Sequence, residues 1–237
     1  MRGDVKGGGR MAQERFPYRA VIFDMDGVIV DTERFYFDQL DEMYAAAGMP
    51  VSHEELCRNV GQSLKDFQKN LVRWFAMGGV ELSIEEAEAR YDAWAKEHPA
   101  DYASLLNPGV RETVAELKNR GVRVALASSS PMDNILHVLE VCGLSGAFEL
   151  VTSGEQFHES KPNPEIYLHT LESLGLPVSA CCCIEDSVPG ITAGKAAGLT
   201  VVAKREERFG FSQDAADVII DAIPDVLDLQ SRVSVED

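Results

Sequence analysis

The 237-residue sequence predicts an α/β fold, in which a parallel sheet carries helices on both faces and an all-helical unit follows the first strand. The first observation is that short apolar runs alternate with segments of helical length from about residue 108 onward, as in βαβ units. The second is that the apolar run at 21–23 is separated from that alternation by a long stretch without a convincing strand. The third is an ordinary composition, 45% hydrophobic and 26% charged, which is typical of a globular domain.

The alternating region is punctuated by proline and glycine. Pro108 suits the first turn of a helix, and Gly121, Gly143 and Gly175 suit helix ends. The predicted elements are helix 108–120, strand 122–129, helix 131–142, strand 148–153, helix 164–174, strand 180–186, helix 188–197, strand 199–203, strand 216–220 and a helix from Pro224.

The stretch between the first strand and this region shows helical periodicity. One helix is expected to end at Gly48, and two capping boxes are predicted, Ser52 with Glu55 and Ser83 with Glu86. An insert at this point would lie over the edge of the sheet as a lid. We expect a flexible tail at 1–17, a core domain from 18–32 and 104–237, and a helical cap domain at 33–103.

Composition excludes several classes of partner. The net charge of −17 argues against nucleic acids and against anionic membrane surfaces, because both attract basic patches. No run of 18 apolar residues and no apolar signal-peptide region is found. The cysteines have neither zinc spacing nor a disulfide pattern, and Cys181–Cys183 suit small apolar filling of a buried strand. We therefore expect a cytoplasmic protein with reduced thiols that acts on a small molecule, as a monomer.

Polar side chains follow the predicted strands at their carboxyl ends. Ligands of open α/β sheets bind at this edge, so these side chains can converge on one site. The set consists of Asp24, Asp26, Ser128, Ser129, Ser130, Glu185, Asp186, Ser187 and, in the loop before a later helix, Lys161. Taken singly, Asp-x-Asp-Gly is common in turns, serines cap helices, and a lysine is usually solvated. Their shared placement is what favours a functional site.

The chemistry of the set indicates phosphoryl transfer. Clustered carboxylates suit Mg²⁺, which prefers oxygen ligands and would relieve their mutual repulsion. An ammonium and a hydroxyl group can hold phosphoryl oxygens. One carboxylate can act as a nucleophile, and a second acid two residues later can protonate the leaving alcohol and then activate water.

Four segments, in order, resemble the four motifs of the haloacid dehalogenase superfamily, over nearly the whole chain from about residue 18. They are FDMDGVIVDT, ALASSS, SKPNPEIY and IEDSVPGITAGKAAG. The helical insert after the first motif is similar to the type I cap of the branch that includes β-phosphoglucomutase and phosphoglycolate phosphatase. The resemblance implies a Rossmann-like core and a Mg²⁺-dependent reaction.

By this resemblance, Asp24 is the nucleophile and a Mg²⁺ ligand, and Asp26 is the general acid/base, with its backbone carbonyl also on the metal. Ser128 and Lys161 match the phosphate-binding positions, and Ser129 adds a backbone N–H.

The fourth motif and the hinge complete the assignment. Asp186 resembles a direct Mg²⁺ ligand, and Glu185 a direct or water-mediated one. Asp31 and Thr32 match the hinge into the cap.

The resemblance also orders the possible reactions. Dehalogenases of the superfamily lack the second acid, so Asp26 favours phosphoryl transfer. A β-phosphoglucomutase-like mutase is the alternative, but Tyr36 and Leu64 stand where that enzyme has a histidine and an arginine. A binding protein without turnover is a third possibility, which the intact set of acids disfavours.

The expected function is thus a phosphatase of a small phosphorylated metabolite, such as a sugar phosphate, acting through an aspartyl phosphate. Substrate selectivity is expected from cap residues, with Glu33, Arg34 and Gln62 as candidates, although Arg34 could equally be a solvated helix residue.

Overall fold

The computed structural model describes residues 16–60 and 64–229. Its centre is a six-stranded sheet of order β3-β2-β1-β4-β5-β6, in which every neighbouring pair is parallel. The first strand of the chain therefore lies in the middle of the sheet, which confirms the predicted parallel α/β architecture. The strands are β1 (Ala20–Phe23), β2 (Arg123–Ser128), β3 (Leu150–Ser153), β4 (Cys181–Glu185), β5 (Thr200–Lys204) and β6 (Val218–Ile220).

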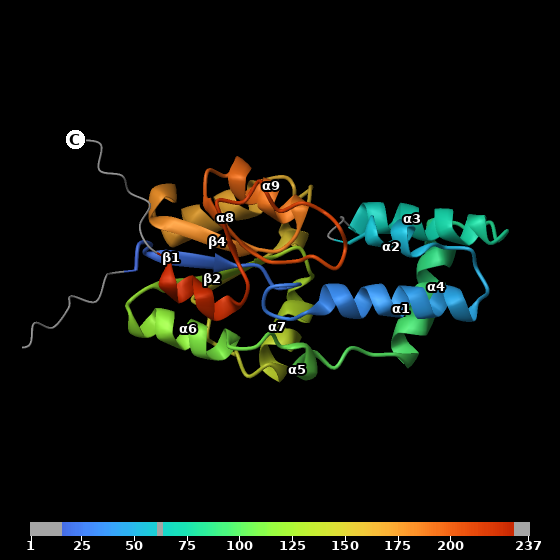
Figure 1. Ribbon diagram of the computed structural model, residues 1–237, viewed down its shortest axis with the longest axis horizontal. Coiled ribbons are helices and arrows are strands. Elements are labelled where there is room, and N and C mark those ends of the chain that lie inside the picture. The colour runs from blue at the N-terminus through green and yellow to red at the C-terminus, as the bar shows by residue number, and fades with distance from the viewer. Residues whose placement is uncertain (1–15, 61–63, 230–237) are drawn as a thin grey trace, which may run out of the picture.

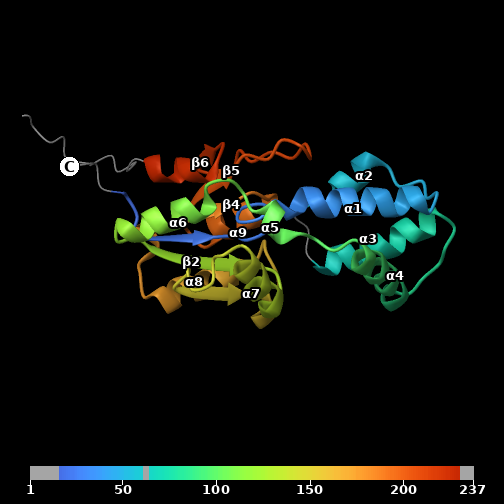
Figure 2. The ribbon, with the colours of Figure 1, turned by 90° about the horizontal axis from the view of Figure 1, so that it is seen from below.

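Helices cover both faces of this sheet, as Figures 1 and 2 show. The helices α6 and α7, with the 3₁₀ helix η3, pack on one face, and α8 and α9 pack on the other. Their bounds are α6 (Val110–Asn119), α7 (Met132–Val141), α8 (Glu165–Leu174), α9 (Val188–Ala196) and η3 (Ile223–Asp228), with short 3₁₀ turns at η1 (Gly154–Gln156) and η2 (Val178–Ala180).

Each strand contributes alternate residues to two apolar cores, one on each face of the sheet. Val21 and Phe23 of β1 face the α6 side, whereas Ala20 and Ile22 face the α8 side, because successive strand residues point to opposite faces. The cysteine triplet of β4 is fully buried and divides in the same way between the two cores. The prediction that these thiols fill a buried strand is confirmed.

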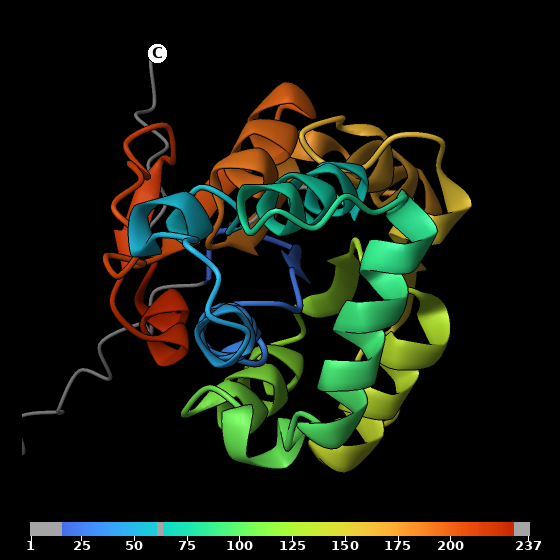
Figure 3. The same ribbon diagram turned by 90° about the vertical axis from the view of Figure 1, so that its right-hand side faces the viewer.

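The helical insert lies beyond the carboxyl ends of the strands (Figure 1). Figure 3 views it from its own side, with α1 seen nearly end-on. A separate apolar cluster holds the insert together, with Leu71 and Trp74 fully buried in it. Its helices are α1 (Thr32–Ala46), α2 (His53–Cys57), α3 (Leu64–Met77) and α4 (Ile84–Glu97), followed by α5 (Tyr102–Leu105) before the chain returns to the core.

One of the two predicted capping boxes forms completely. Ser83 accepts a hydrogen bond from the backbone of Glu86, whose side chain accepts one from the backbone of Ser83. Ser52 accepts from the backbone N–H of Glu55, but the Glu55 carboxylate is bound by Arg73 instead of returning to Ser52. A tertiary ion pair has replaced the second half of that box.

Several elements differ from the sequence prediction; β3 begins at Leu150 and not at 148, and β6 begins at Val218 and not at 216. Helix α6 begins at Val110 and not at Pro108, because Gly109 has a left-handed φ of 78° that a helical residue cannot adopt. The final element is the 3₁₀ helix η3 in place of an α-helix. Among residues 16–60 and 64–229, no helix combines the length and apolarity that crossing a membrane requires.

Candidate active site

The strand register brings two acids side by side at the carboxyl edge of the sheet. Phe23 of β1 pairs with Ile184 of β4, so the next residues, Asp24 and Glu185, lie at the same level. The backbone N–H of Asp24 donates to the carbonyl oxygen of Ile184 at 3.0 Å. One carboxylate oxygen each from Asp24, Glu185 and Asp186 fall within 4.8 Å of one another. Three buried carboxylates are therefore concentrated at one point.

Lys161 supplies the positive charge next to this cluster. Its Nζ lies 2.8 Å from Asp24 Oδ1 and 2.7 Å from Glu185 Oε1, and it donates to the carbonyl oxygen of Ala127 at 3.2 Å. The Tyr167 hydroxyl of α8 also donates to Glu185 Oε1. Burial by itself lowers the pKa of Lys161, but the carboxylates of Asp24 and Glu185 outweigh it and hold the pKa above its ordinary value. The lysine thus stays charged.

One ammonium does not balance three carboxylates. Burial, followed by the charge of Asp24, raises the pKa of Glu185 to about 7, despite the opposing effect of Lys161. Burial, followed by the charge of Glu33, raises the pKa of Asp186 well above its ordinary range. Both raised pKa values indicate that the protein alone stabilises the negative charges of Glu185 and Asp186 poorly.

The unused oxygens of this cluster fit a small divalent cation. Glu185 Oε2 and Asp186 Oδ2 are buried without a hydrogen-bond partner within the described chain, although buried polar atoms are normally paired. Two glycines make room for these two oxygens. A Cβ on Gly27 would come within 1.8 Å of Asp186 Oδ2, and one on Gly190 within 1.9 Å of Glu185 Oε2. An all-oxygen set of this kind suits Mg²⁺.

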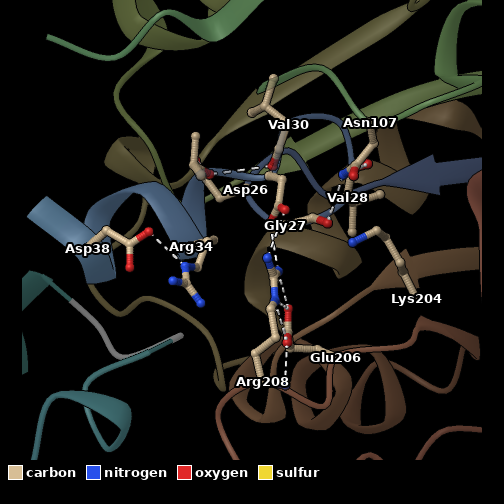
Figure 4. A network of polar contacts seen from close by, with 12 residues as sticks. Asp26, Gly27, Val28, Val30, Arg34, Asp38, Asn107, Lys204, Glu206 and Arg208 are labelled. Carbon is tan, nitrogen blue, oxygen red and sulfur yellow. Dashed lines mark hydrogen bonds and ion pairs between the residues drawn. The ribbon is translucent and has the colours of Figure 1, made fainter. Parts of the chain in front are cut away.

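Asp26 lies on a tight turn that follows β1. Gly27 N–H donates to the carbonyl oxygen of Val30 at 2.7 Å, and the buried Asn107 amide donates to the carbonyl oxygens of Gly27 and Val28 at 3.1 and 2.9 Å (Figure 4). Gly27 has a φ of 77°, which favours glycine at this turn. Asn107, from the segment that returns to the core, therefore holds the turn that carries Asp26.

Two hydroxyl groups fix the Asp26 carboxyl. Thr32 Oγ1 donates to Oδ1 at 2.7 Å, and Ser130 Oγ donates to Oδ2 at 3.0 Å. Loss of hydration, followed by the charge of Asp24, raises the pKa of Asp26, while the two hydrogen bonds act in the opposite direction. A raised pKa favours the protonated form, which is the form that can donate a proton.

The serines after β2 and β4 have different positions. Ser128 is fully buried, and its Oγ accepts a hydrogen bond from the backbone N–H of Ser130 at 3.1 Å. Ser129 and Ser130 line the pocket. Ser187 caps α9 by accepting from the backbone N–H of Gly190. Helix capping and site formation thus occur together at this edge.

A cavity of about 560 Å³ opens above these groups, between the sheet edge and the insert. Asp24, Asp26, Lys161 and Asp186 form part of its floor, and residues of the insert form the opposite wall. The described lining comprises Asp24, Asp26, Glu33, Phe35, Tyr36, Gln39, Leu40, Asn59, Leu64, Phe67, Tyr91, Ala95, Ala100, Tyr102, Ser129, Ser130, Pro131, Ser160, Lys161, Asp186, Ser187 and Pro189.

The selectivity candidates have three different outcomes. Glu33 lines the pocket. Arg34 is exposed and pairs with Asp38 at 2.7 Å (Figure 4). It is not among the residues that line the pocket. Asp38 lies one turn further along α1 and forms an ion pair with Arg34 on the exposed side of the helix, away from the cavity. Gln62 lies outside the described residues.

Other contacts around the site had no clear signal in the sequence. From the sequence, Tyr167 would be taken for a core aromatic residue on a helix, and only the fold shows that its hydroxyl binds Glu185. Asn107 reads as a loop residue before a proline. Ser130 belongs to the set of polar side chains predicted to converge at this edge, but nothing local in the sequence indicates that it binds Asp26.

The loop after β5 connects the core to the insert. Arg208 forms two hydrogen bonds to the Asp31 carboxylate, at 2.8 and 2.7 Å, and also pairs with the buried Glu206 (Figure 4). Phe209 belongs to the apolar cluster of the insert, with its ring centroid 5.4 Å from that of Phe37.

Comparisons with known proteins agree with this geometry. Residues 18–198 match the model of the haloacid dehalogenase-like hydrolase family. The chain is 34% identical over 182 residues to the phosphorylated carbohydrates phosphatase of Thermotoga maritima, spanning 76% of this chain and 82% of that protein. It is 36% identical over 180 residues to hexitol phosphatase B of Escherichia coli, spanning 75% and 79% of the two chains.

A solved structure extends the likeness to three dimensions. CbbY from Rhodobacter sphaeroides, in complex with phosphate, matches with a TM-score of 0.67 and 25% identity, over 90% of this chain and 100% of that chain. The family match covers both the carboxylate cluster and Lys161, and the named relatives are phosphatases. This chain therefore belongs to the haloacid dehalogenase-like hydrolase family, as a phosphoric monoester hydrolase.

Proposed function

We propose that this protein is a Mg²⁺-dependent phosphatase of a small phosphorylated metabolite, with a sugar phosphate as the leading class, and that it works through an aspartyl phosphate on Asp24. The observation that carries the proposal is the convergence of Asp24, Asp26 and Lys161 with the three-carboxylate cluster in one pocket. Relatives named for phosphorylated carbohydrates and hexitols support the substrate class.

In the first step, a carboxylate oxygen of Asp24 attacks phosphorus and the ester P–O bond breaks. The proton on Asp26 passes to the departing alcohol oxygen, so the leaving group departs neutral. The raised pKa of Asp26 favours the protonated form, and its two hydroxyl partners hold the carboxyl in a fixed orientation, which supports this role.

In the second step, Asp26, now a carboxylate, takes a proton from water. The water oxygen attacks phosphorus, the bond to Asp24 breaks, and phosphate leaves. Lys161 and the serines after β2, Ser128 and Ser129, are proposed to hold the phosphoryl oxygens.

Asp24, Glu185 and Asp186 would hold the cation, together with the backbone carbonyl of Asp26. Bound Mg²⁺ would supply positive charge that offsets the charges of the phosphoryl group and of these carboxylates. The insert, residues 33–103, is proposed as a cap that limits the entry of water while the phosphoryl group is transferred.

Replacing Asp24 tests the proposal directly. Asp24→Asn keeps the size of the side chain but removes the nucleophile, and we expect phosphate release to fall by about 10⁴-fold or more. The measurement is phosphate release from a panel of sugar phosphates with Mg²⁺ or with EDTA, alongside circular dichroism to establish folding. Asp41→Asn, an exposed residue on α1, is the matched control. Phosphate release that persists in folded Asp24→Asn would contradict the nucleophile assignment.

A sugar-phosphate mutase is the competing proposal. It would return a phosphorylated isomer in place of free phosphate, so product analysis with β-glucose 1-phosphate and a bisphosphate primer distinguishes the two. The apolar Leu64 in the pocket wall counts against it, since a bisphosphate needs a second cationic contact.

A further inference from the structure

Asp186 differs from the other two carboxylates of the cluster in how it is held. Lys161 binds one oxygen of Asp24 and one of Glu185, at 2.8 and 2.7 Å. Asp186 Oδ2, by contrast, is buried and has no hydrogen-bond partner among residues 16–60 and 64–229. The direction of this carboxylate therefore depends on the backbone of Asp186, which carries it.

The backbone of Asp186 is held by a side-chain amide from a distant loop. Gln213 is buried, and its Nε2 donates to the carbonyl oxygen of Asp186 at 2.6 Å and to that of Lys204 at 2.8 Å. A primary amide has two N–H groups, so both donors are used. Its Oε1 accepts a hydrogen bond from the backbone N–H of Glu206 at 2.9 Å. The side chain of Gln213 thus bridges the backbone that follows β4 and the backbone at the end of β5.

The strand register explains why one side chain can reach both carbonyl groups. The last described pair between β4 and β5 is Glu185 with Ala203. Asp186 and Lys204 are the next residues of the two chains, and Gln213 joins them there. The amide therefore extends the hold of the sheet by one residue, to the residue that carries the third carboxylate.

Gln213 itself lies on a segment that is fixed to the sheet. Its carbonyl oxygen accepts a hydrogen bond from the backbone N–H of Ala216 at 3.0 Å. The next residue, Asp217, donates its backbone N–H to the carbonyl oxygen of Val201 at 2.9 Å, and its Oδ2 accepts from the backbone N–H of Val201 at 2.8 Å. A side chain that starts from such a base can fix the position of a metal ligand, as outer contacts of metal sites do.

We propose that Gln213 is a positioning residue for the cation site, which holds the Asp186 carboxylate in place through the carbonyl oxygen of that residue. The inference rests on the proposed Mg²⁺-dependent function and concerns the same site. Gln213 is not among the residues that line the pocket, so it acts through Asp186 and not on the substrate directly. Mg²⁺ demands near-ideal octahedral geometry, which makes its affinity sensitive to a displaced ligand.

Removing the amide tests this role by calorimetry with MgCl₂ alone, with circular dichroism to establish folding. Gln213→Met keeps the length of the side chain and loses its hydrogen bonds, and we expect Mg²⁺ affinity to fall by about tenfold or more. Gln213→Asn has an amide that is one methylene shorter and cannot span the two carbonyl groups. It should lower the affinity in the same direction, and it serves as the test if Gln213→Met does not fold. Unchanged Mg²⁺ affinity in the folded variant would overturn the proposal.

Arg205 provides the matched control on the same loop. It is exposed, and its side chain pairs with Asp221 at 2.6 Å and with Glu207 at 3.4 Å. Arg205→Gln removes these ion pairs without touching Gln213, so Mg²⁺ affinity should stay within about twofold of the wild type. An equal fall of affinity in Arg205→Gln and Gln213→Met would assign the effect to the loop as a whole and overturn the role of Gln213.

Kinetics distinguish positioning from a loss of stability. In Gln213→Met, the Mg²⁺ concentration for half-maximal phosphate release should rise by about tenfold, while kcat at saturating Mg²⁺ stays within about threefold of the wild type. A variant that is only less stable would lose kcat in proportion to its folded fraction and keep the wild-type Mg²⁺ dependence. That result would contradict the positioning role.

The two proposals can fail separately. Mg²⁺ binding that depends on Gln213, in a wild-type protein that releases phosphate from no ester, would overturn the phosphatase proposal and leave the positioning role standing. Mg²⁺-dependent phosphate release with unchanged Mg²⁺ affinity in Gln213→Met would do the reverse.

Discussion

The floor of the pocket concentrates buried charge, whereas the wall is mostly apolar. The floor concentrates charge at the carboxyl edge of the sheet, with three carboxylates within 4.8 Å and two buried oxygens that no described group satisfies. The wall contributed by the insert pairs its polar groups internally and presents mostly apolar surface.

The difference shows how the two tasks are divided. Buried unsatisfied charge is costly in a protein, and the proposed Mg²⁺ ion and phosphoryl group would offset that cost. Under the proposed function, the chemistry would take place at the edge of the sheet, and the separately packed insert would contact the rest of the substrate.

Among the variants that distinguish the floor from the wall, the largest effect should come from placing a side chain beside the carboxylates. In Gly27→Ala, the new Cβ would come within 1.8 Å of Asp186 Oδ2, at a residue whose φ is 77°. We expect kcat to fall by about a thousandfold or more, with Mg²⁺ affinity measured by calorimetry falling in parallel. Gly121→Ala is the matched control, because Gly121 has the same φ of 77° with nothing within 4 Å of a Cβ. Equal losses in the two variants would assign the effect to backbone strain and not to the carboxylate.

A second prediction separates the stability of the insert from that of the floor. Trp74 is fully buried in the apolar cluster of the insert, and Trp74→Ala should cost about 3 kcal/mol of unfolding free energy, measured by urea denaturation. Calorimetric Mg²⁺ affinity should change by less than about twofold, since the three carboxylates lie outside that cluster.

Trp94, which is only partly buried and stacks on His98, provides the control for the loss of an indole. Trp94→Ala should cost about 1 kcal/mol. Loss of Mg²⁺ binding in Trp74→Ala would show that the floor depends on the packing of the insert.

The smallest effect concerns the contact between the two regions. Burial alone would raise the pKa of Asp31, but the Arg208 guanidinium holds it below the ordinary value of 3.8. A depressed pKa contributes stability that is present above the unfolded-state pKa and is lost as the pH falls through the folded-state pKa. Asp31→Asn should therefore cost about 1 kcal/mol at pH 7, and the difference from the wild type should shrink below about pH 4.

The exposed pair of Arg34 and Asp38 is the matched control for this effect. Asp38→Asn should cost about 0.3 kcal/mol at pH 7 by the same denaturation measurement. A cost for Asp31→Asn that stays constant from pH 7 to pH 3 would contradict an ionic origin.

The positions of some site residues could be predicted from the sequence, and those of others could not. Asp24, Glu185 and Asp186 follow buried strands directly, and parallel strands align their carboxyl ends, so their convergence could be predicted from local pattern. Arg34 and Glu33 are neighbours on one helix, and nothing in their composition shows which faces the cavity; the packing angle of α1 decides that.

Other contacts between distant segments could not be predicted from local pattern. Tyr167 and Phe209 look like ordinary core aromatics, yet one binds Glu185 and the other enters the cluster of the insert. Their partners lie far away in the chain, and only the assembled fold brings them together.

Phe209 has a consequence for attempts to exchange the insert between members of the family. By chain order it belongs to the core, and by packing it belongs to the insert, where its ring lies beside Phe37. A chimaera that replaces only residues 33–103 would leave a buried aromatic side chain facing a foreign surface. The unit to be exchanged is therefore discontinuous: residues 33–103 must be transferred together with the loop 205–213.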